Sequence, residues 1–390
     1  MKTTILLTSF FLTVSCTSVS QEQTVAQQDS LTVDTVTTHR IRLLFAGDLM
    51  QHQAQIDAAK ITGGYDYSDN FTLVKEEIQQ ADIAIANLEV TFGGKPYRGY
   101  PQFSAPDEYL FAIKDAGFDV LTIATNHIWD KGRKGMERTV MMLDSVQMPY
   151  AGAYINQQAR DSIYPLLIEK NGFRIALLNY TYGINGYEKF NSYSAHTVNI
   201  IDKLVIADDI RKARNMKPDA IIACMHWGEE YKSLPNREQI SLTDWMLSKG
   251  VTHIIGSHPH VLQPMEIRKD SIRNTEHVVV YSLGNFISNM SVRKTDGGAM
   301  VKLELSKDSV TRVDKCEYAL VWTERPALSR RKNYRLLPVN YPQDSLRQAS
   351  VIKFTLFRDD SRALLDIHNK GITEYLFREK LSGESLEVQR

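Results

Sequence analysis

The sequence contains few cysteines, since Cys16, Cys224 and Cys316 are the only three among its 390 residues. Cys16 lies near the amino terminus, and the other two lie in apolar surroundings. Three scattered cysteines argue against a disulfide framework and against a cysteine-rich structural zinc site. A hydrophobic core must therefore stabilise the chain.

An excess of charge of either sign is also missing, because 46 basic residues balance 46 acidic residues. No basic cluster interleaved with aromatic residues is present, and this absence argues against a nucleic-acid partner. The chain has no internal repeat and no low-complexity tract. With 43% apolar residues, a chain of this length can bury one large core or two smaller ones.

The apolar run at residues 5–14 is too short to span a bilayer as a mature helix. It follows a positive charge and precedes a small residue and Cys16. This arrangement resembles a bacterial lipoprotein signal, although Thr13 replaces the usual leucine. We expect residues 1–15 to be a signal peptide and residues 16–40 a flexible tether, with the lipid on the cysteine. The protein would then be a lipoprotein of the cell envelope, anchored to a membrane and facing the periplasm or the exterior. The alternative is ordinary secretory cleavage with an unrelated cysteine.

From residue 41 onward, short apolar runs end in small residues followed by a polar group. These runs are residues 42–46, 83–86, 120–124, 220–225, 251–255 and 277–281. Stretches with the apolar spacing of helices separate them, at residues 73–80, 109–116, 136–146, 204–215 and 240–249. Strands that alternate with helices predict a layered α/β domain with much parallel pairing, which we place at residues 41–310.

Two histidines, His258 and His260, lie on either side of Pro259. The apolar run before them breaks at Gly256, and the proline keeps the residue before it out of helical geometry, so both imidazoles lie on a turn. If the run is a strand, the turn lies beyond its carboxyl end, where open α/β sheets bind ligands. Two neighbouring imidazoles suit a metal ion. The alternative is that each histidine only forms hydrogen bonds within a loop.

Other strand ends carry further candidate ligands. They are Asp48, Glu89, Asn126, His127 and His226, with His52 four residues after the first. Each has an ordinary explanation when taken singly, such as a capped turn, a solvated carboxylate or a packed histidine. Together they provide carboxylate, amide and imidazole groups without thiolate, a set that suits Mn, Fe or Zn. The set is large enough for two divalent ions that share a bridging carboxylate and activate a water.

Six motifs occur in order along the chain. They are GDLM at 47–50, ANLE at 86–89, ATNH at 124–127, HWGEEY at 226–231, GSHPHVLQ at 256–263 and SLGNF at 282–286. This series resembles the CapA family of poly-γ-glutamate capsule proteins, which is related to the calcineurin-like metallophosphoesterases. The resemblance covers residues 41–305 and implies a four-layer α/β/β/α metallophosphoesterase-like sandwich with a dinuclear metal site.

The resemblance also implies roles for individual residues. The implied metal ligands are Asp48, Glu89, Asn126, His226, His258 and His260. Glu89 takes the place of the usual bridging aspartate, and His127 matches the acid that protonates the leaving group. The phosphoesterase pattern has a histidine where this chain has Met50, and His52 is a possible replacement.

Further candidates lie beside these ligands. Asp130 comes three residues after His127 and is placed to orient it. Arg98 and Phe103, in a loop with glycine and proline, are candidates for binding an anionic substrate, as is Asn285 in the last motif. A solvated loop is the alternative explanation for the first two.

The resemblance implies a metal-dependent hydrolase that acts on or handles poly-γ-glutamate or a related anionic polymer, in contact with capsule synthesis or export proteins. One alternative is a non-catalytic protein that binds polymer during assembly and export. Another is a phosphoesterase of the nucleotidase type. No chemistry-bearing motif follows residue 305, and we expect residues 311–390 to form a carboxyl-terminal extension that packs on the domain or reaches a partner.

Overall fold

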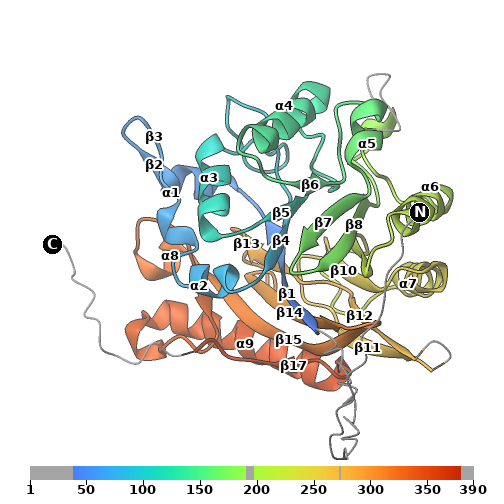
Figure 1. Cartoon of the computed structure of the whole chain (residues 1–390). Coiled ribbons are helices and arrows are strands. Elements are labelled where there is room, and N and C mark those ends of the chain that lie inside the picture. Colours follow the sequence, from blue (N-terminus) through green and yellow to red (C-terminus); the bar gives the residue numbers. More distant parts are fainter. Residues whose placement is uncertain (1–37, 190–196, 272–273, 379–390) are drawn as a thin grey trace, which may run out of the picture. The chain divides into compact units, whose positions relative to one another are not determined.

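Two β-sheets face each other in the computed structural model, which describes residues 38–189, 197–271 and 274–378 (Figure 1). In spatial order, the first sheet consists of β16 (Arg335–Pro338), β15 (Thr311–Glu324), β14 (Gly297–Lys307), β1 (His39–Leu49), β4 (Ile83–Leu88), β5 (Val120–Thr122) and β6 (Tyr150–Ala151). In addition, β13 (Asn285–Ile287) pairs with β1, and β17 (Thr373–Glu374) pairs with β15. The strands β1, β4, β5 and β6 are parallel, whereas β14, β15 and β16 continue the sheet in antiparallel order.

The second sheet has a parallel centre with one antiparallel strand at each edge. In spatial order it consists of β11 (Met265–Asp270), β12 (Thr275–Val280), β10 (His253–Ser257), β9 (Ala220–His226), β8 (Phe173–Thr181) and β7 (Leu166–Lys170). The four central strands are parallel. A separate hairpin pairs β2 (Lys60–Ile61) with β3 (Gly64–Tyr65).

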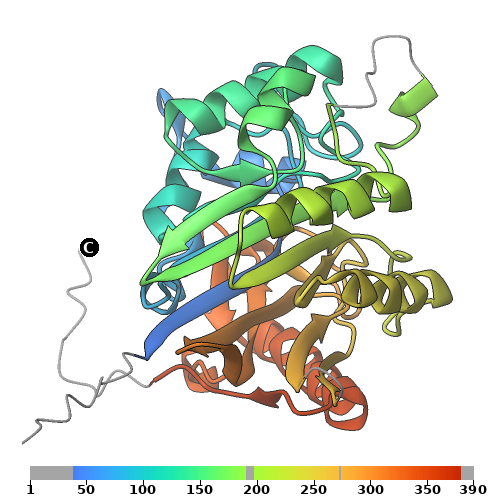
Figure 2. The same cartoon turned by 45° about the vertical axis from the view of Figure 1, so that its right-hand side comes forward.

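Helices cover the outer faces of both sheets (Figure 2). Those beside the first sheet are α2 (Lys75–Gln79), α3 (Asp107–Ala116), α4 (Gly132–Ser145) and α9 (Gln348–His368), and those beside the second are α6 (Lys203–Asn215) and α7 (Arg237–Lys249). Shorter helices are α1 (Gln53–Ala59), α5 (Gln157–Ile163) and α8 (Pro326–Ser329), and 3₁₀ turns lie at Ser68–Asn70, Tyr187–Lys189 and Gln343–Ser345. The order of layers is α/β/β/α, which confirms the predicted fold class. Every predicted apolar run and helical stretch overlaps an observed strand or helix.

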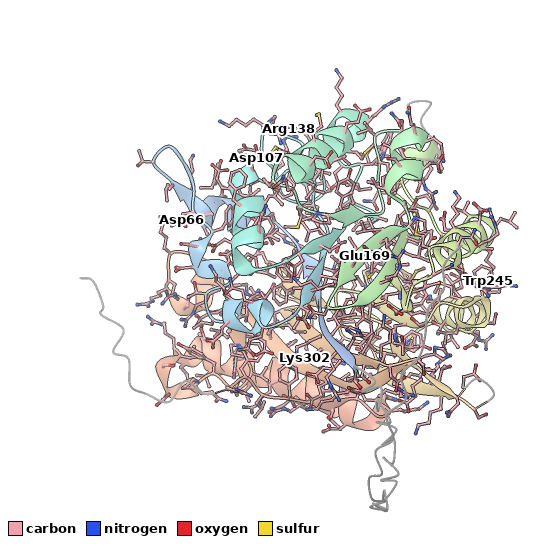
Figure 3. The ribbon with its side chains drawn as sticks, in the orientation of Figure 1. Asp66, Asp107, Arg138, Glu169, Trp245 and Lys302 are labelled. Atoms are coloured by element: carbon pink, nitrogen blue, oxygen red, sulfur yellow. The ribbon has the colours of Figure 1, made fainter. Side chains whose placement is uncertain are left out.

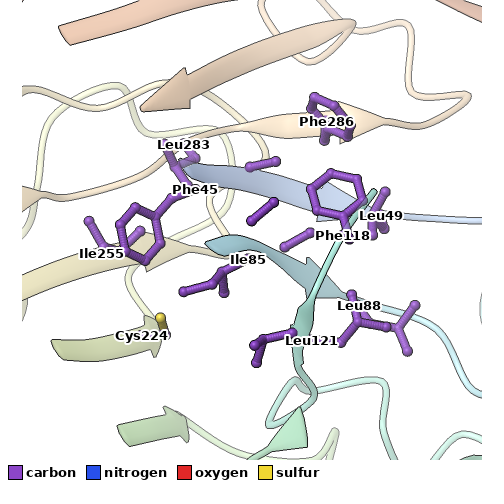
Figure 4. Packing of buried hydrophobic residues seen from close by; sticks show 14 of the residues in the cluster. Phe45, Leu49, Ile85, Leu88, Phe118, Leu121, Cys224, Ile255, Leu283 and Phe286 are labelled. Carbon is purple, nitrogen blue, oxygen red and sulfur yellow. The ribbon is translucent and has the colours of Figure 1, made fainter. Parts of the chain in front are cut away.

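Buried side chains fill the space between the sheets (Figure 4). Phe45 of β1 and Ile255 of β10 are almost fully buried where these two strands meet. On the other side of the first sheet, the rings of Phe118 and Phe286 lie 5.7 Å apart. Each such side chain stabilises the fold by about 1.5–3 kcal/mol relative to an exposed position. The strands that carry the polar motifs are therefore fixed by packing on both faces.

The segment expected to be a carboxyl-terminal extension contributes to the first sheet. Its strand β15 pairs with β14 along the length of both strands, and α9 packs on β15. The Phe354 ring lies 5.7 Å from the Trp322 ring, and Phe357 packs so closely on Gly297 that an added Cβ would lie 2.5 Å from its ring. The described part of this segment thus packs on the domain.

An ion pair between two outer helices also holds the loop that follows Glu89. Arg138 of α4 donates two hydrogen bonds, of 2.8 and 2.7 Å, to the carboxylate of Asp107 on α3 (both labelled in Figure 3). The same guanidinium donates to the backbone oxygen of Phe92, and the Thr139 hydroxyl accepts from the Phe92 nitrogen at 2.9 Å. These contacts fix the chain just after Glu89. Signal peptide, Cys16 and most of the tether lie outside the described residues.

Candidate metal centre

The carboxyl ends of parallel strands from both sheets meet at one place. Asp48 lies at the end of β1 and Glu89 directly after β4, while His226 ends β9 and His258 directly follows β10. The backbone nitrogen of Asp48 donates to Gly284 O at 3.1 Å. This close approach requires glycine before the aspartate, because a Cβ on residue 47 would lie 2.0 Å from that oxygen.

Three overlapping groups of side chains at this place could each hold a metal ion. They are Asp48 with Glu89 and His260, Glu89 with His226 and His258, and Glu230 with His258 and His260. Within each group the potential ligand atoms lie within 4.8 Å of one another. All of these residues are buried except Glu230. Because Glu89 belongs to two buried groups, it is positioned to bridge them.

The Glu89 carboxylate fits a bound cation. The residue is completely buried, and neither carboxylate oxygen has a hydrogen-bond partner. Its Oε1 lies 3.4 Å from His226 Nε2 and 3.8 Å from His260 Nε2. A buried carboxylate without hydrogen bonds costs several kcal/mol unless a positive charge lies beside it, and either a bound cation or a protonated His260 would supply that charge. Asp48 Oδ2 and His258 Nδ1 are likewise buried without a hydrogen-bond partner.

Two asparagines contact His226. The Oδ1 atom of Asn126 lies 2.8 Å from His226 Nε2, so the predicted amide ligand is beside the predicted imidazole ligand. Asn87 lies on the other side, with Nδ2 2.8 Å from Asp48 Oδ1 and 3.3 Å from His226 Nδ1. No role was predicted for Asn87, although it belongs to the same strand-end motif as Glu89. Its amide links the candidate ligands of the two sheets.

The two-histidine turn has a constrained backbone. His258 has a φ of 96° and His260 a φ of 57°, and Pro259 lies between them. Left-handed conformations of non-glycine residues cost about 1–3 kcal/mol and are common at functional sites. The surrounding packing enforces the turn, and His260 Nδ1 lies 3.1 Å from Asn285 Oδ1 and 3.3 Å from Asp48 Oδ2.

Electrostatics within the cluster set the ionisation of its members. Burial tends to lower the pKa of His260, but the carboxylates of Glu89 and Asp48 raise it to about 9. Burial raises the pKa of Asp48, and the negative charge of Glu89 raises it further. Burial and the neighbouring His226 hold the pKa of His258 well below its ordinary value. His258 is therefore neutral at physiological pH, which is the form that binds a metal ion.

His127 and Asp130 form a buried pair next to the cluster. His127 Nδ1 lies 2.7 Å from Asp130 Oδ2, and the same oxygen accepts a hydrogen bond of 2.8 Å from the Phe103 nitrogen. The Phe103 ring contacts the His127 ring edge-on, with centroids 4.7 Å apart. Although burial lowers the pKa of His127, the hydrogen bond to Asp130 raises it above its ordinary value. This pairing leaves Nε2 of His127 as the atom free to exchange a proton.

The remaining predicted residues belong to none of the three ligand groups. The half-buried His52 is the N-cap residue of α1, and its Nδ1 accepts a hydrogen bond of 3.3 Å from the Asn289 nitrogen. Arg98 is exposed and pairs through its backbone with Ser104. Phe103 is buried against His127, and Asn285 is buried with its amide oxygen on His260, so neither lies open on the surface.

Exposed tyrosines surround the centre. Tyr182, 46% exposed, lies with its ring centroid 4.5 Å from that of His258, and Tyr231, 49% exposed, lies 6.4 Å from His260. Tyr100, 73% exposed, lies 6.5 Å from the His127 ring. Tyr182 follows β8, whose carboxyl end carries no residue typical of metal binding, so no pattern in the sequence pointed to it.

Residues 42–290 match the model of a family described as bacterial capsule synthesis protein PGA_cap. The chain belongs to this family. It is 28% identical over 287 residues to a capsule biosynthesis protein CapA of Bacillus anthracis, a match that covers 70% of this chain and 66% of that protein. It is also 27% identical over 315 residues to a PGA biosynthesis protein CapA of Bacillus subtilis, covering 79% of this chain and 76% of that protein.

Among solved structures, a calcineurin-like phosphoesterase of Bacillus subtilis is similar at a TM-score of 0.45 and 13% identity, covering 83% of this chain and 98% of that one. A Haemophilus influenzae NAD nucleotidase is similar at a TM-score of 0.44 and 10% identity, covering 87% of this chain and 58% of that one.

Proposed function

We propose that this CapA family member is a metal-dependent hydrolase of the bacterial cell envelope, and that it cleaves poly-γ-glutamate or a related anionic polymer. The observation that carries the proposal is the Glu89 carboxylate, which is fully buried, lacks hydrogen bonds and is shared by two ligand groups. A carboxylate in this position is suited to two divalent ions, for which Mn, Fe and Zn fit the oxygen and nitrogen ligands.

The proposed ligands divide around that carboxylate. Asp48 and His260 would hold one ion together with Glu89, and His226 and His258 would hold the other. Asn126 adds an amide oxygen beside His226. When bound, such a pair of ions supplies an activated water at neutral pH and positive charge for the oxygen of the bond under attack.

His127 is the proposed acid. Hydrolysis of a γ-glutamyl amide breaks the bond between the carbonyl carbon and the nitrogen, and the departing nitrogen must receive a proton. Asp130 holds Nδ1 of His127 and stabilises the protonated ring, so Nε2 can donate that proton. The exposed rings of Tyr100, Tyr182 and Tyr231 lie beside the histidines of the centre, where an anionic polymer would lie.

The direct test combines metal analysis with a hydrolysis screen on the full chain. We expect the purified protein to contain divalent metal and to shorten poly-γ-glutamate, with activity lost in chelator and restored by added metal. Cleavage of phosphoesters alone would replace the proposed substrate. Stoichiometric metal and tight polymer binding without cleavage would favour the non-catalytic binding protein, and absence of bound metal would reject the metal centre.

Attachment to the envelope is tested separately through Cys16. In the described residues, no helix is long and apolar enough to cross a bilayer, and the proposed anchor is a lipid on this cysteine. Cys16→Ser should remove the protein from the membrane fraction, because the thiol is the site of lipid attachment, while leaving hydrolysis unchanged. Recovery of a lipid-bearing Cys16→Ser variant in the membrane fraction at the wild-type level would reject the lipoprotein assignment.

A further inference from the structure

Glu230 is an exposed carboxylate at the solvent side of the centre, and it lies in the HWGEEY motif at 226–231, of which only His226 was a predicted ligand. One of its oxygens lies within 4.8 Å of ligand nitrogens of His258 and His260, so it forms the third ligand group. Resting on the proposed function, we propose that Glu230 is an additional metal ligand, supplied from the loop at residues 228–236, that closes the centre towards solvent.

The loop holds Glu230 firmly in this place. The next residue, Tyr231, donates its backbone N–H to Pro259 O at 2.8 Å, which joins the loop to the two-histidine turn itself. Tyr231 has a φ of 66°, a left-handed conformation that turns the chain at this contact. This hydrogen bond joins the residue after Glu230 to the residue between His258 and His260. It therefore fixes the position of Glu230 relative to both histidines.

A buried amide anchors the rest of the loop. Gln263 is completely buried, and its Nε2 donates to Lys232 O at 2.8 Å and to Leu234 O at 3.2 Å. Its Oε1 accepts a hydrogen bond of 2.8 Å from Gln239 of α7. Because Gln263 follows the two-histidine turn in the sequence, one short segment carries both the ligands and the support for the loop that bears Glu230.

The unsatisfied atoms of the centre point to an ion near Glu230. His258 is 3% exposed and its Nδ1 has no hydrogen-bond partner, whereas most buried polar atoms in proteins have one. A neutral imidazole nitrogen beside a carboxylate is a favourable pair of ligands for a divalent ion. With Asp48 and Glu89, Glu230 would bring three negative charges to two divalent ions. One positive charge would remain to attract an anionic substrate.

The neighbouring Glu229 provides a matched control. It is also exposed and lies on the same loop, but it belongs to no ligand group, and its Oε1 accepts from Asn236 Nδ2 at 3.4 Å. Glu230→Gln and Glu229→Gln each remove one negative charge near the centre. Only the first removes a carboxylate within reach of His258 and His260.

The experiment measures the affinity of the full-length variants for Zn²⁺ and Mn²⁺ by competition with a chelator of known affinity, together with the metal-dependent rise in melting temperature. We expect Glu230→Gln to weaken binding of at least one ion by about 10-fold or more, the range found when residues supporting metal ligands are removed. Glu229→Gln should change affinity by less than about 3-fold. The melting temperature of the metal-free protein should stay the same in both variants, because both side chains are exposed.

Equal affinities of Glu230→Gln and wild type would overturn the inference and leave the proposed hydrolase intact. Equal losses in Glu230→Gln and Glu229→Gln would also overturn it, since the effect would then be one of charge alone. A wild-type protein that binds neither ion would instead reject the metal centre on which the inference rests.

Discussion

At the scale of single residues, the contact between His127 and Asp130 separates proton transfer from metal binding. The 2.7 Å distance from Nδ1 to Oδ2 commits one side of the ring to the carboxylate, and the Phe103 nitrogen holds that carboxylate in place. His127 belongs to none of the groups that could hold an ion. It is therefore suited to donate a proton and is not needed to retain metal.

His127→Ala should keep its metal and lose activity. Removal of a positioned general acid typically slows a reaction by about 10²- to 10⁴-fold, and the loss should shrink for substrates with good leaving groups, which need less protonation. Metal content by elemental analysis and kcat on substrates with different leaving groups measure both effects. As a comparison, His226→Ala should lose metal. A loss of metal as large in His127→Ala as in His226→Ala would show that His127 is a ligand.

The places of Asn87 and Glu230 in the centre could not be predicted from the sequence. Asp48, Glu89 and the histidines could be predicted because each follows an apolar run, and strand ends of a parallel sheet gather at one edge. Nothing distinguishes Glu230 from Glu229 in the sequence, because the hydrogen bonds from Tyr231 and Gln263 that position the loop are tertiary. The contribution of Asn87 likewise depends on a partner in the other sheet.

At the scale of elements, the strands that end in polar motifs could be predicted more readily than β8 and β14, which carry no such motif. The apolar strand β8 lies beside β9 in the second sheet, but it ends at Thr181, and β14 carries charged residues among its apolar ones. Neither offers a strong local signal. Their positions are set by pairing with distant strands, which a single sequence does not reveal.

The strand β10 begins with a buried titratable residue, His253. His253 is 2% exposed, and its Nδ1 accepts a hydrogen bond of 3.0 Å from the Val278 nitrogen of β12. Burial and the neighbouring His277 lower the pKa of His253 from 6.5 to about 3. The folded protein thus requires the neutral ring, whereas the unfolded chain binds a proton below about pH 6.5.

We expect this residue to make the fold sensitive to acid. Its contribution to stability is present above pH 6.5 and is lost as the pH falls towards 3, at about 1.4 kcal/mol per pH unit for one proton. Between pH 6.5 and 5 the loss amounts to roughly 2 kcal/mol. His253→Asn keeps an acceptor for the Val278 nitrogen but cannot be protonated, so its free energy of unfolding should fall less steeply over this range. Urea denaturation at several pH values measures the slope, and parallel slopes for the variant and wild type would contradict the assignment.

At the scale of the whole molecule, the two sheets depend on each other for the centre. The first sheet provides Asp48 and Glu89, and the second provides His226, His258 and His260. No single sheet holds a complete ligand set, so formation of the site requires the sheets to pack face to face. Metal binding should therefore stabilise the packing of the whole domain, since a ligand that binds only the folded state adds to the free energy of unfolding.

This coupling predicts the behaviour of the ligand variants. With metal at about 100 times its Kd, wild type should gain about 2.7 kcal/mol over the chelated protein, which corresponds to a rise of several degrees in Tm. His226→Ala and His258→Ala should each lose metal and most of this rise, although His226 ends β9 and His258 follows β10. Because both serve one cluster, the double variant should lose little more than either single variant. Calorimetry with and without chelator measures the shifts. Single variants that keep full metal content and the wild-type shift would place the metal elsewhere and would support the polymer-binding alternative over the hydrolase.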